Sequence, residues 1–210
     1  MTIPADRLIP GVQLPESLLS RRSHGSLDTI MDSERRPLRP IGATAREVAA
    51  RTGELLAELL TLPSVRIFEG VRPTSADLPR IAHAVNAGCR LVLVESVAWP
   101  PGRYVATSAG YIHCDGVYTG QSAGPLMAAV RHWRAILPRG HRVKAIVVVY
   151  PTDQGVLSLP GPSAHGVAWT RSAEVVSDIR AYLPAGRIAI SLHAVAALAA
   201  AVEDCEQAQP

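Results

Sequence analysis

Three acidic residues of this chain have the chemistry to hold a divalent cation. Glu95 ends a run of aliphatic residues that is typical of a buried strand, Glu54 lies in a helical pattern, and Asp77 lies shortly before Pro79. Carboxylate oxygens are the ligands that Mg²⁺ and Mn²⁺ prefer. Two carboxylates seldom make a selective site, so Glu54 and Glu95 would need Asp77 as a third anchor. Each glutamate also has an ordinary interpretation, because exposed glutamates are common on protein surfaces.

Four arginines lie close together in the segments RHWR and RGHR, namely Arg131, Arg134, Arg139 and Arg142. Guanidinium groups neutralise phosphates and an interleaved aromatic ring can stack on a base, so this stretch is a candidate nucleic-acid-binding segment. The alternative is structural. Trp133 fits the apolar stripe of a helix, its arginine neighbours fit the solvated face, and cations near a helix end favour the helix dipole.

The composition indicates a mildly basic protein without a membrane anchor. The 21 basic and 18 acidic residues give a net charge of +3 and an isoelectric point near 9.0, which falls short of a strong nucleic-acid footprint. Cys89, Cys114 and Cys205 are widely separated, so neither a disulfide framework nor a zinc site is indicated. The longest apolar run, 188–202, is shorter than the roughly 20 residues that span a bilayer, and no secretory signal is recognisable. We therefore expect a cytoplasmic protein.

Hydrophobic periodicity predicts a single α/β domain with a mixed sheet and helices on its faces. Helix patterns with start signals at Thr44, Pro125 and Ser172 are followed by an Ala-rich helix at the end of the chain. The predicted helices cover 44–62, 125–137, 172–183 and 187–204, and the predicted strands cover 64–70, 80–87, 89–97, 104–106, 110–113, 144–150 and 167–169.

The chain is expected to divide into three segments. Residues 1–40 contain five prolines and little periodicity, which predicts an extended or flexible arm without a core. Residues 41–184 hold the predicted domain. Residues 185–210 hold the Ala-rich helix, which packs on the domain or binds a second copy or another protein through an apolar face.

The order of these elements, together with a few residues, resembles the nuclease-related domain (NERD) family of the restriction-endonuclease-like superfamily, over roughly residues 44–184. Gly53-Glu54 matches a Gly-Glu pair on the family's first helix. The sequence Ile81-Ala82-His83 matches the family's I-D-H block. Glu95-Ser96-Val97 stands where the family has E-x-K, and Trp99 and Gly102 follow as an aromatic residue and a glycine do in the family. Glu95 comes 13 positions after Ala82, which is the spacing between the family's Asp and Glu. Pro125 and Ala128 stand where the family has a proline and a glutamine.

The resemblance implies a metal-dependent nuclease whose reactive groups have been lost. In such an enzyme the Asp and Glu hold the metal, and the Lys stabilises developing charge on the same strand face. Here Ala82 supplies no ligand and Val97 supplies no amine, so Glu54 and Glu95 are vestigial. His83, next to Ala82, is expected to be a packed or hydrogen-bonded histidine.

Three hypotheses follow. The first is a catalytically degenerate domain that needs no cofactor and binds nucleic acid, with DNA as the candidate, or protein. The second is a surviving nuclease with Mg²⁺ or Mn²⁺ held by Glu54, Glu95 and Asp77. The third is an assembly subunit that makes no nucleic-acid contact and uses the N-terminal arm and the Ala-rich helix.

Overall fold

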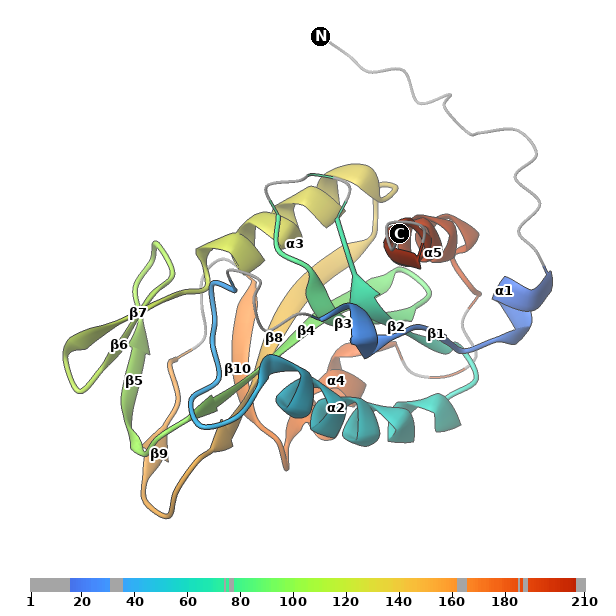
Figure 1. The fold of residues 1–210 in the computed structure, drawn as a ribbon. Coiled ribbons are helices and arrows are strands. Elements are labelled where there is room, and N and C mark those ends of the chain that lie inside the picture. Colours follow the sequence, from blue (N-terminus) through green and yellow to red (C-terminus); the bar gives the residue numbers. More distant parts are fainter. Residues whose placement is uncertain are drawn as a thin grey trace, which may run out of the picture.

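The computed structural model describes residues 16–30, 36–73, 75, 78–161, 166–184, 186 and 189–206, and it is a mixed α/β fold with two mixed sheets flanked by helices (Figure 1). Its strands are β1 (Ser23–Gly25), β2 (Val65–Val71), β3 (Ile81–Ala87), β4 (Arg90–Trp99), β5 (Gly102–Ala106), β6 (Tyr111–Cys114), β7 (Val117–Ser122), β8 (Arg142–Pro151), β9 (Leu157–Ser158) and β10 (Val167–Arg171). Its α-helices are α1 (Glu16–Ser20), α2 (Ala45–Leu56), α3 (Gly124–Ile136), α4 (Val175–Tyr182) and α5 (Leu192–Glu206), with 3-10 helices η1 (Leu27–Thr29) and η2 (Ala57–Thr61). The predicted α/β class is confirmed.

The larger sheet has the order β1-β2-β3-β4-β8-β10 within the described residues. Strands β2, β3 and β4 form an antiparallel meander, whereas β4, β8 and β10 run parallel, with α3 between β4 and β8 in the chain. The middle strands β4 and β8 are buried on both faces, which explains their nearly continuous aliphatic sequences. The four main predicted strands are confirmed to within two residues at each end.

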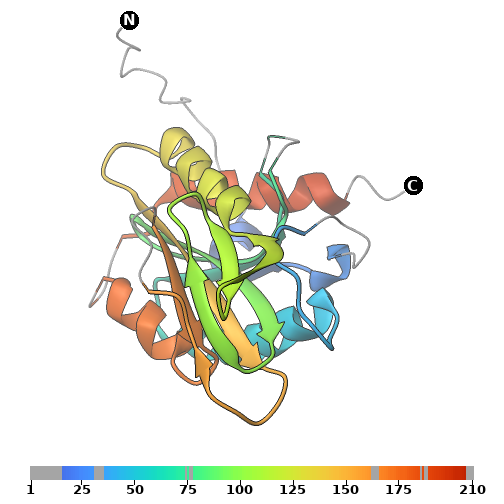
Figure 2. The ribbon, with the colours of Figure 1, turned by 90° about the vertical axis from the view of Figure 1, so that its left-hand side faces the viewer.

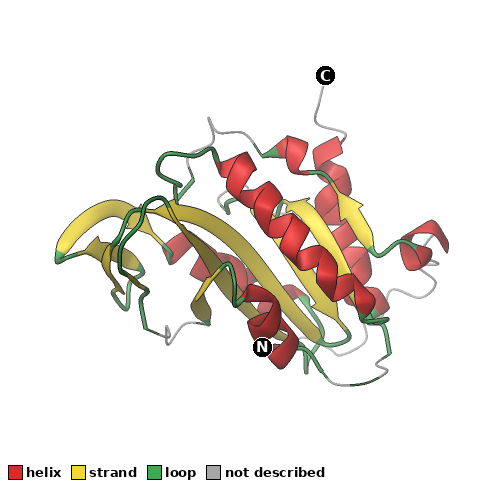
Figure 3. Ribbon diagram, turned by 90° about the horizontal axis from the view of Figure 1, so that it is seen from below, coloured by secondary structure: helices red, strands yellow, loops and turns green. Residues whose placement is uncertain are grey.

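Two helical layers cover the larger sheet. Side chains of α2 and α4 pack in one apolar cluster with one face of the sheet, and side chains of α3 and α5 pack in another with the opposite face. Figure 2 shows α3 and α5 above the strands and α2 and α4 below them. The view from below in Figure 3 shows helices in front of the strands. No described helix is long and apolar enough to cross a membrane.

A smaller sheet with the order β7-β6-β5-β9 projects from one end of the larger one (Figure 1). The predicted short hairpin at 104–106 and 110–113 corresponds to β5 and β6. Strand β7 was not predicted, because its mainly polar sequence VYTGQS lies on the surface and lacks a clear alternation.

Helix α2 begins as the sequence predicts and ends earlier. Thr44 accepts a hydrogen bond from the Glu47 amide, and the Glu47 carboxylate accepts one from the Thr44 amide, which completes a capping box. The chain continues as η2, so the prediction of one helix over 44–62 is wrong in its last turns. The predicted cap at Ser172 is also wrong, since α4 begins at Val175 after Glu174.

Residues of the N-terminal segment belong to the folded core. Strand β1 pairs in parallel with β2 at the sheet edge, and the side chains of Ile30 and Leu38 are buried. The expectation that residues 1–40 contribute no core is therefore wrong at these positions. Gly25 has φ of +85°, and a Cβ there would lie 2.3 Å from the Glu69 carbonyl oxygen, so the close approach of β1 requires glycine.

Helix α5 packs its apolar face on the strands at this same edge. Ala194, Val195, Leu198 and Val202 are buried in the cluster that includes β2 residues, and α5 contacts β1, β2 and β3. The predicted C-terminal helix is thus present from Leu192. The face that would mark an assembly interface is covered by the chain's own sheet.

Candidate functional site

The first candidate site lies where β3 and β4 separate. The last registered pair between these strands is His83 with Val94, and Ala82 and Glu95 follow it on either side. The Glu95 carboxylate fills the gap by accepting a hydrogen bond of 2.8 Å from the Ala82 amide to Oε1. Ala82 and Glu95, the two positions 13 residues apart on which the resemblance to the nuclease-related domains depends, are therefore in direct contact.

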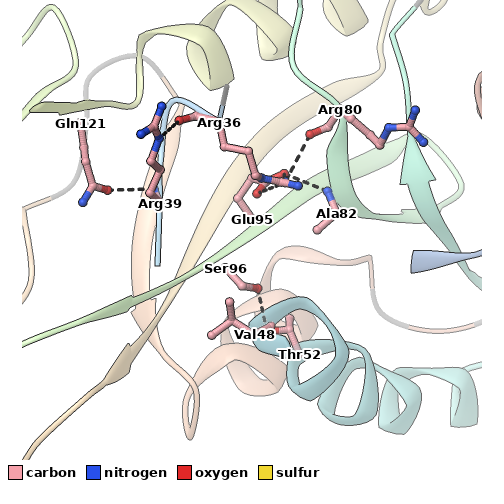
Figure 4. Close-up of polar contacts among 9 residues, drawn as sticks. All are labelled: Arg36, Arg39, Val48, Thr52, Arg80, Ala82, Glu95, Ser96 and Gln121. Atoms are coloured by element: carbon pink, nitrogen blue, oxygen red, sulfur yellow. Dashed lines mark hydrogen bonds and ion pairs between the residues drawn. The ribbon is translucent and has the colours of Figure 1, made fainter. Parts of the chain in front are cut away.

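A second group, the Arg36 guanidinium, holds the same carboxylate (Figure 4). Arg36 Nη2 donates to Glu95 Oε2 at 2.8 Å and to Oε1 at 3.1 Å, with the two side chains only 8% and 9% exposed. Charge-assisted bonds of this length are among the stronger hydrogen bonds in proteins. Both carboxylate oxygens of Glu95 are thus engaged by protein donors.

The segment after Arg36 is anchored to the smaller sheet. The Arg39 amide donates to Gln121 Oε1 at 3.0 Å, and the Ser122 amide donates to the Pro37 carbonyl at 2.9 Å. The Trp99 indole also donates to Gln121 Oε1. These bonds fix residues 36–39 and so aim the Arg36 side chain at Glu95.

A small cavity adjoins the ion pair. Its lining consists of Arg36, Pro37, Leu38, Pro79, Arg80, Ile81, Glu95 and Leu126. Leu126 belongs to α3, so Glu95 points toward the α3 side of the sheet. Val97, two residues further along β4, is fully buried in the core cluster on that side. An aliphatic side chain thus stands where the resemblance would place an amine.

Glu54 is not brought to Glu95. It is exposed on α2, and α2 contacts β4 through the Thr52 and Ser96 hydroxyls, which lie 2.7 Å apart (Figure 4). Successive side chains of a strand point to opposite faces, so α2 lies on the face that Glu95 does not use. Asp77 lies outside the described residues. Among those that are described, no three His, Cys, Asp or Glu side chains gather as a metal site would require.

No family model, curated protein or solved structure matches this chain. The chemistry of the site must therefore be inferred from its own residues. A carboxylate already bound to a guanidinium and an amide is a poor metal ligand and a poor general base, because three hydrogen bonds occupy most of its roughly four acceptor positions and the guanidinium charge repels a second cation.

His83 is the other functional group near the strand separation. It is fully buried, and neither ring nitrogen has a hydrogen-bond partner among the described residues. Burial lowers its pKa to about 4, so the ring is neutral at physiological pH. Gly53 of α2 lies beside it, and a Cβ there would come within 3.1 Å of Nε2. The prediction of a packed histidine is confirmed, although the hydrogen bond is not found.

The four arginines predicted to bind nucleic acid do not share one surface. Arg131 and Arg139 are exposed. Arg134 donates from Nε and Nη2 to the Val143 carbonyl, at 3.1 and 2.7 Å, and so joins α3 to β8. Arg142 opens β8 next to the buried Val143, which packs in the cluster of the α3 face, so its side chain points toward the α4 face.

Sequence reasoning missed Arg36, which lies 59 positions before its carboxylate partner in a segment without periodicity. One arginine of the pair Arg35-Arg36 before Pro37 gives no signal for such a contact.

Proposed function

We propose that this chain is a divergent relative of the nuclease-related domains that does not cleave phosphodiester bonds and that binds nucleic acid. The observation that carries the loss of cleavage is the occupation of both Glu95 oxygens by Arg36 and the Ala82 amide. The Arg36 guanidinium is a permanent cation, and it takes the position beside the Glu95 carboxylate that a hydrated Mg²⁺ would have to occupy.

The arrangement of elements supports the kinship. The helix α2, the meander β2-β3-β4, the helix α3 and the strand β8 follow in the order that first suggested it. The contact between Ala82 and Glu95 supports the alignment of these residues with a metal-binding Asp and Glu. The residues present do not fit a metal centre of that kind, because Ala82 has no ligand atom and Val97 has no amine.

Nucleic-acid binding is proposed because exposed arginines and a small excess of positive charge are available to contact phosphates. Arg131, Arg139 and Arg142 are accessible, and the chain carries a net charge of +3. A cytoplasmic location is part of the proposal, and it agrees with Cys89 and Cys114, which are free thiols.

Two assays test the proposal. Supercoiled and single-stranded DNA incubated with the protein in Mg²⁺ or Mn²⁺ should stay intact. Cleavage that disappears in the Glu95→Ala variant would overturn the loss of activity. Fluorescence anisotropy with labelled DNA should show binding that weakens steeply with salt, as phosphate contacts require. Absence of binding at 50 mM salt would refute the binding role.

A further inference from the structure

We infer that Arg90 and Lys144, which lie over the Tyr182 ring, and Arg142, which is paired with Arg90, form the surface that contacts the phosphates of a bound nucleic acid. The inference rests on the proposed function and names its site. Arg90 opens β4, Arg142 and Lys144 open the neighbouring parallel strand β8, and Tyr182 ends α4. The three cations thus come from the amino ends of two central strands.

The sheet register puts the three cations on one face. Arg90 is paired with Arg142, and Lys144 is paired with Val92, whose side chain lies in the cluster covered by α2 and α4. Since paired residues share a face, and so do residues two apart, all three side chains point toward α4. The Tyr182 ring centroid lies 4.3 Å from Lys144 Nζ and 5.1 Å from Arg90 Cζ.

No salt bridge joins these cations to an acidic side chain in the described part of the chain. The ion pairs found there are Arg36 with Glu95 and Arg46 with Asp28, both elsewhere. Asp178 of α4 is the acid that acts on Lys144 from a distance, and it accepts a hydrogen bond from Thr170. Burial lowers the pKa of Lys144, an effect that an arriving anion would oppose.

The geometry suits a polyanion. Residues two apart on a strand are about 6.7 Å apart and neighbouring strands about 4.8 Å apart, so the strands distribute the charges over a surface. Cation–π contact with Tyr182 holds Lys144 and Arg90 in place, which reduces the side-chain entropy lost on binding. Contacts of this kind bind the phosphates of the nucleic acid and do not discriminate between bases.

The test compares two triple variants by anisotropy with labelled single-stranded and duplex DNA between 50 and 200 mM salt. The first is Arg90→Gln, Arg142→Gln and Lys144→Gln. The control replaces three exposed arginines elsewhere with glutamine, at Arg51, Arg72 and Arg103, and so removes the same charge.

The site variant should bind at least tenfold more weakly than the control, and its log–log salt slope for duplex DNA should fall by about 2.7, or 0.9 for each phosphate contact. Lys144→Arg should retain binding. If the wild type binds and both triple variants behave alike, this site is wrong and the proposed function stands. If the wild type does not bind DNA at 50 mM salt, the proposed function fails first.

Two further measurements complete the test. Urea denaturation of the site variant should give the wild-type midpoint within the range expected for surface changes, which separates lost contacts from lost folding. Vesicles containing phosphatidylserine should bind the wild type more weakly than DNA does. Tighter binding to the vesicles, abolished in the site variant, would overturn the assignment in favour of a membrane surface.

Discussion

Replacing Arg36 with methionine should lower the free energy of unfolding by about 3–5 kcal/mol, the usual effect of leaving one member of a buried ion pair alone. Methionine keeps much of the apolar stem of arginine, so the variant removes chiefly the charge and its hydrogen bonds. Among the described residues, the Ala82 amide would then be the remaining hydrogen-bond donor to Glu95, whose side chain is 9% exposed.

A double-mutant cycle isolates the pair. Glu95→Gln keeps an oxygen for the Ala82 amide and removes the negative charge, so it should recover at least half of the loss when combined with Arg36→Met. The control is Arg46→Met, which breaks the exposed pair with Asp28. The side chains of that pair are 58% and 67% exposed, so the change should be below about 1 kcal/mol.

The assay is urea denaturation at pH 7, with free energies compared at constant m-value. A loss below about 1 kcal/mol for Arg36→Met would refute the reasoning. So would a double variant as unstable as the single one, because the cost would then not come from an uncompensated carboxylate.

Three other predictions concern the frame around the site. His83 is protonated below about pH 6.5 in the unfolded state and only below about pH 4 in the folded state. The free energy of unfolding should therefore fall by about 3 kcal/mol as the pH drops through this window. The urea midpoint of His83→Leu should not show this decline. Gly25→Ala should lower the free energy of unfolding in urea by more than about 2 kcal/mol, because the added Cβ would clash with the backbone of Glu69. Gly42 has φ of +72° but open space around it, so Gly42→Ala should lower that free energy by only about 1 kcal/mol. Equal losses in the two variants would contradict the clash. Leu198 is fully buried, so Leu198→Ala should reduce the free energy of unfolding by about 2–5 kcal/mol and lower the thermal midpoint. Leu192 is 53% exposed, so Leu192→Ala should change the midpoint little. Similar midpoints for the two variants would mean that α5 is not packed as described.

Features that depend on residues close together in the sequence, such as buried strands and helix caps, could be predicted. The aliphatic runs of β4 and β8 indicate buried strands because they are short and rich in β-branched valine. The Thr44 and Glu47 capping box marks the start of α2 because its bonds join residues three apart.

Contacts between distant segments were not predictable in the same way. Strand β1 has three residues, Ser23–Gly25, and becomes a strand only because the edge of β2 offers it hydrogen-bonding partners. Arg36 likewise acquires its role from Glu95, which the fold brings to it. The cluster around Tyr182 combines the starts of two strands with the end of a helix, and no spacing in the chain records that meeting.

The packing of α5 against β1 and β2 has a consequence for synthesis. One of the first strands and the last helix of the described chain share an edge of the sheet, and Val202 lies close to Gly25. A ribosome delivers residues 194–202 after all the described strands, so β2 keeps an apolar surface uncovered until α5 has been synthesised and has left the ribosome. Nascent chains halted before Leu192 should therefore engage chaperones that recognise apolar segments, and release should follow the arrival of α5.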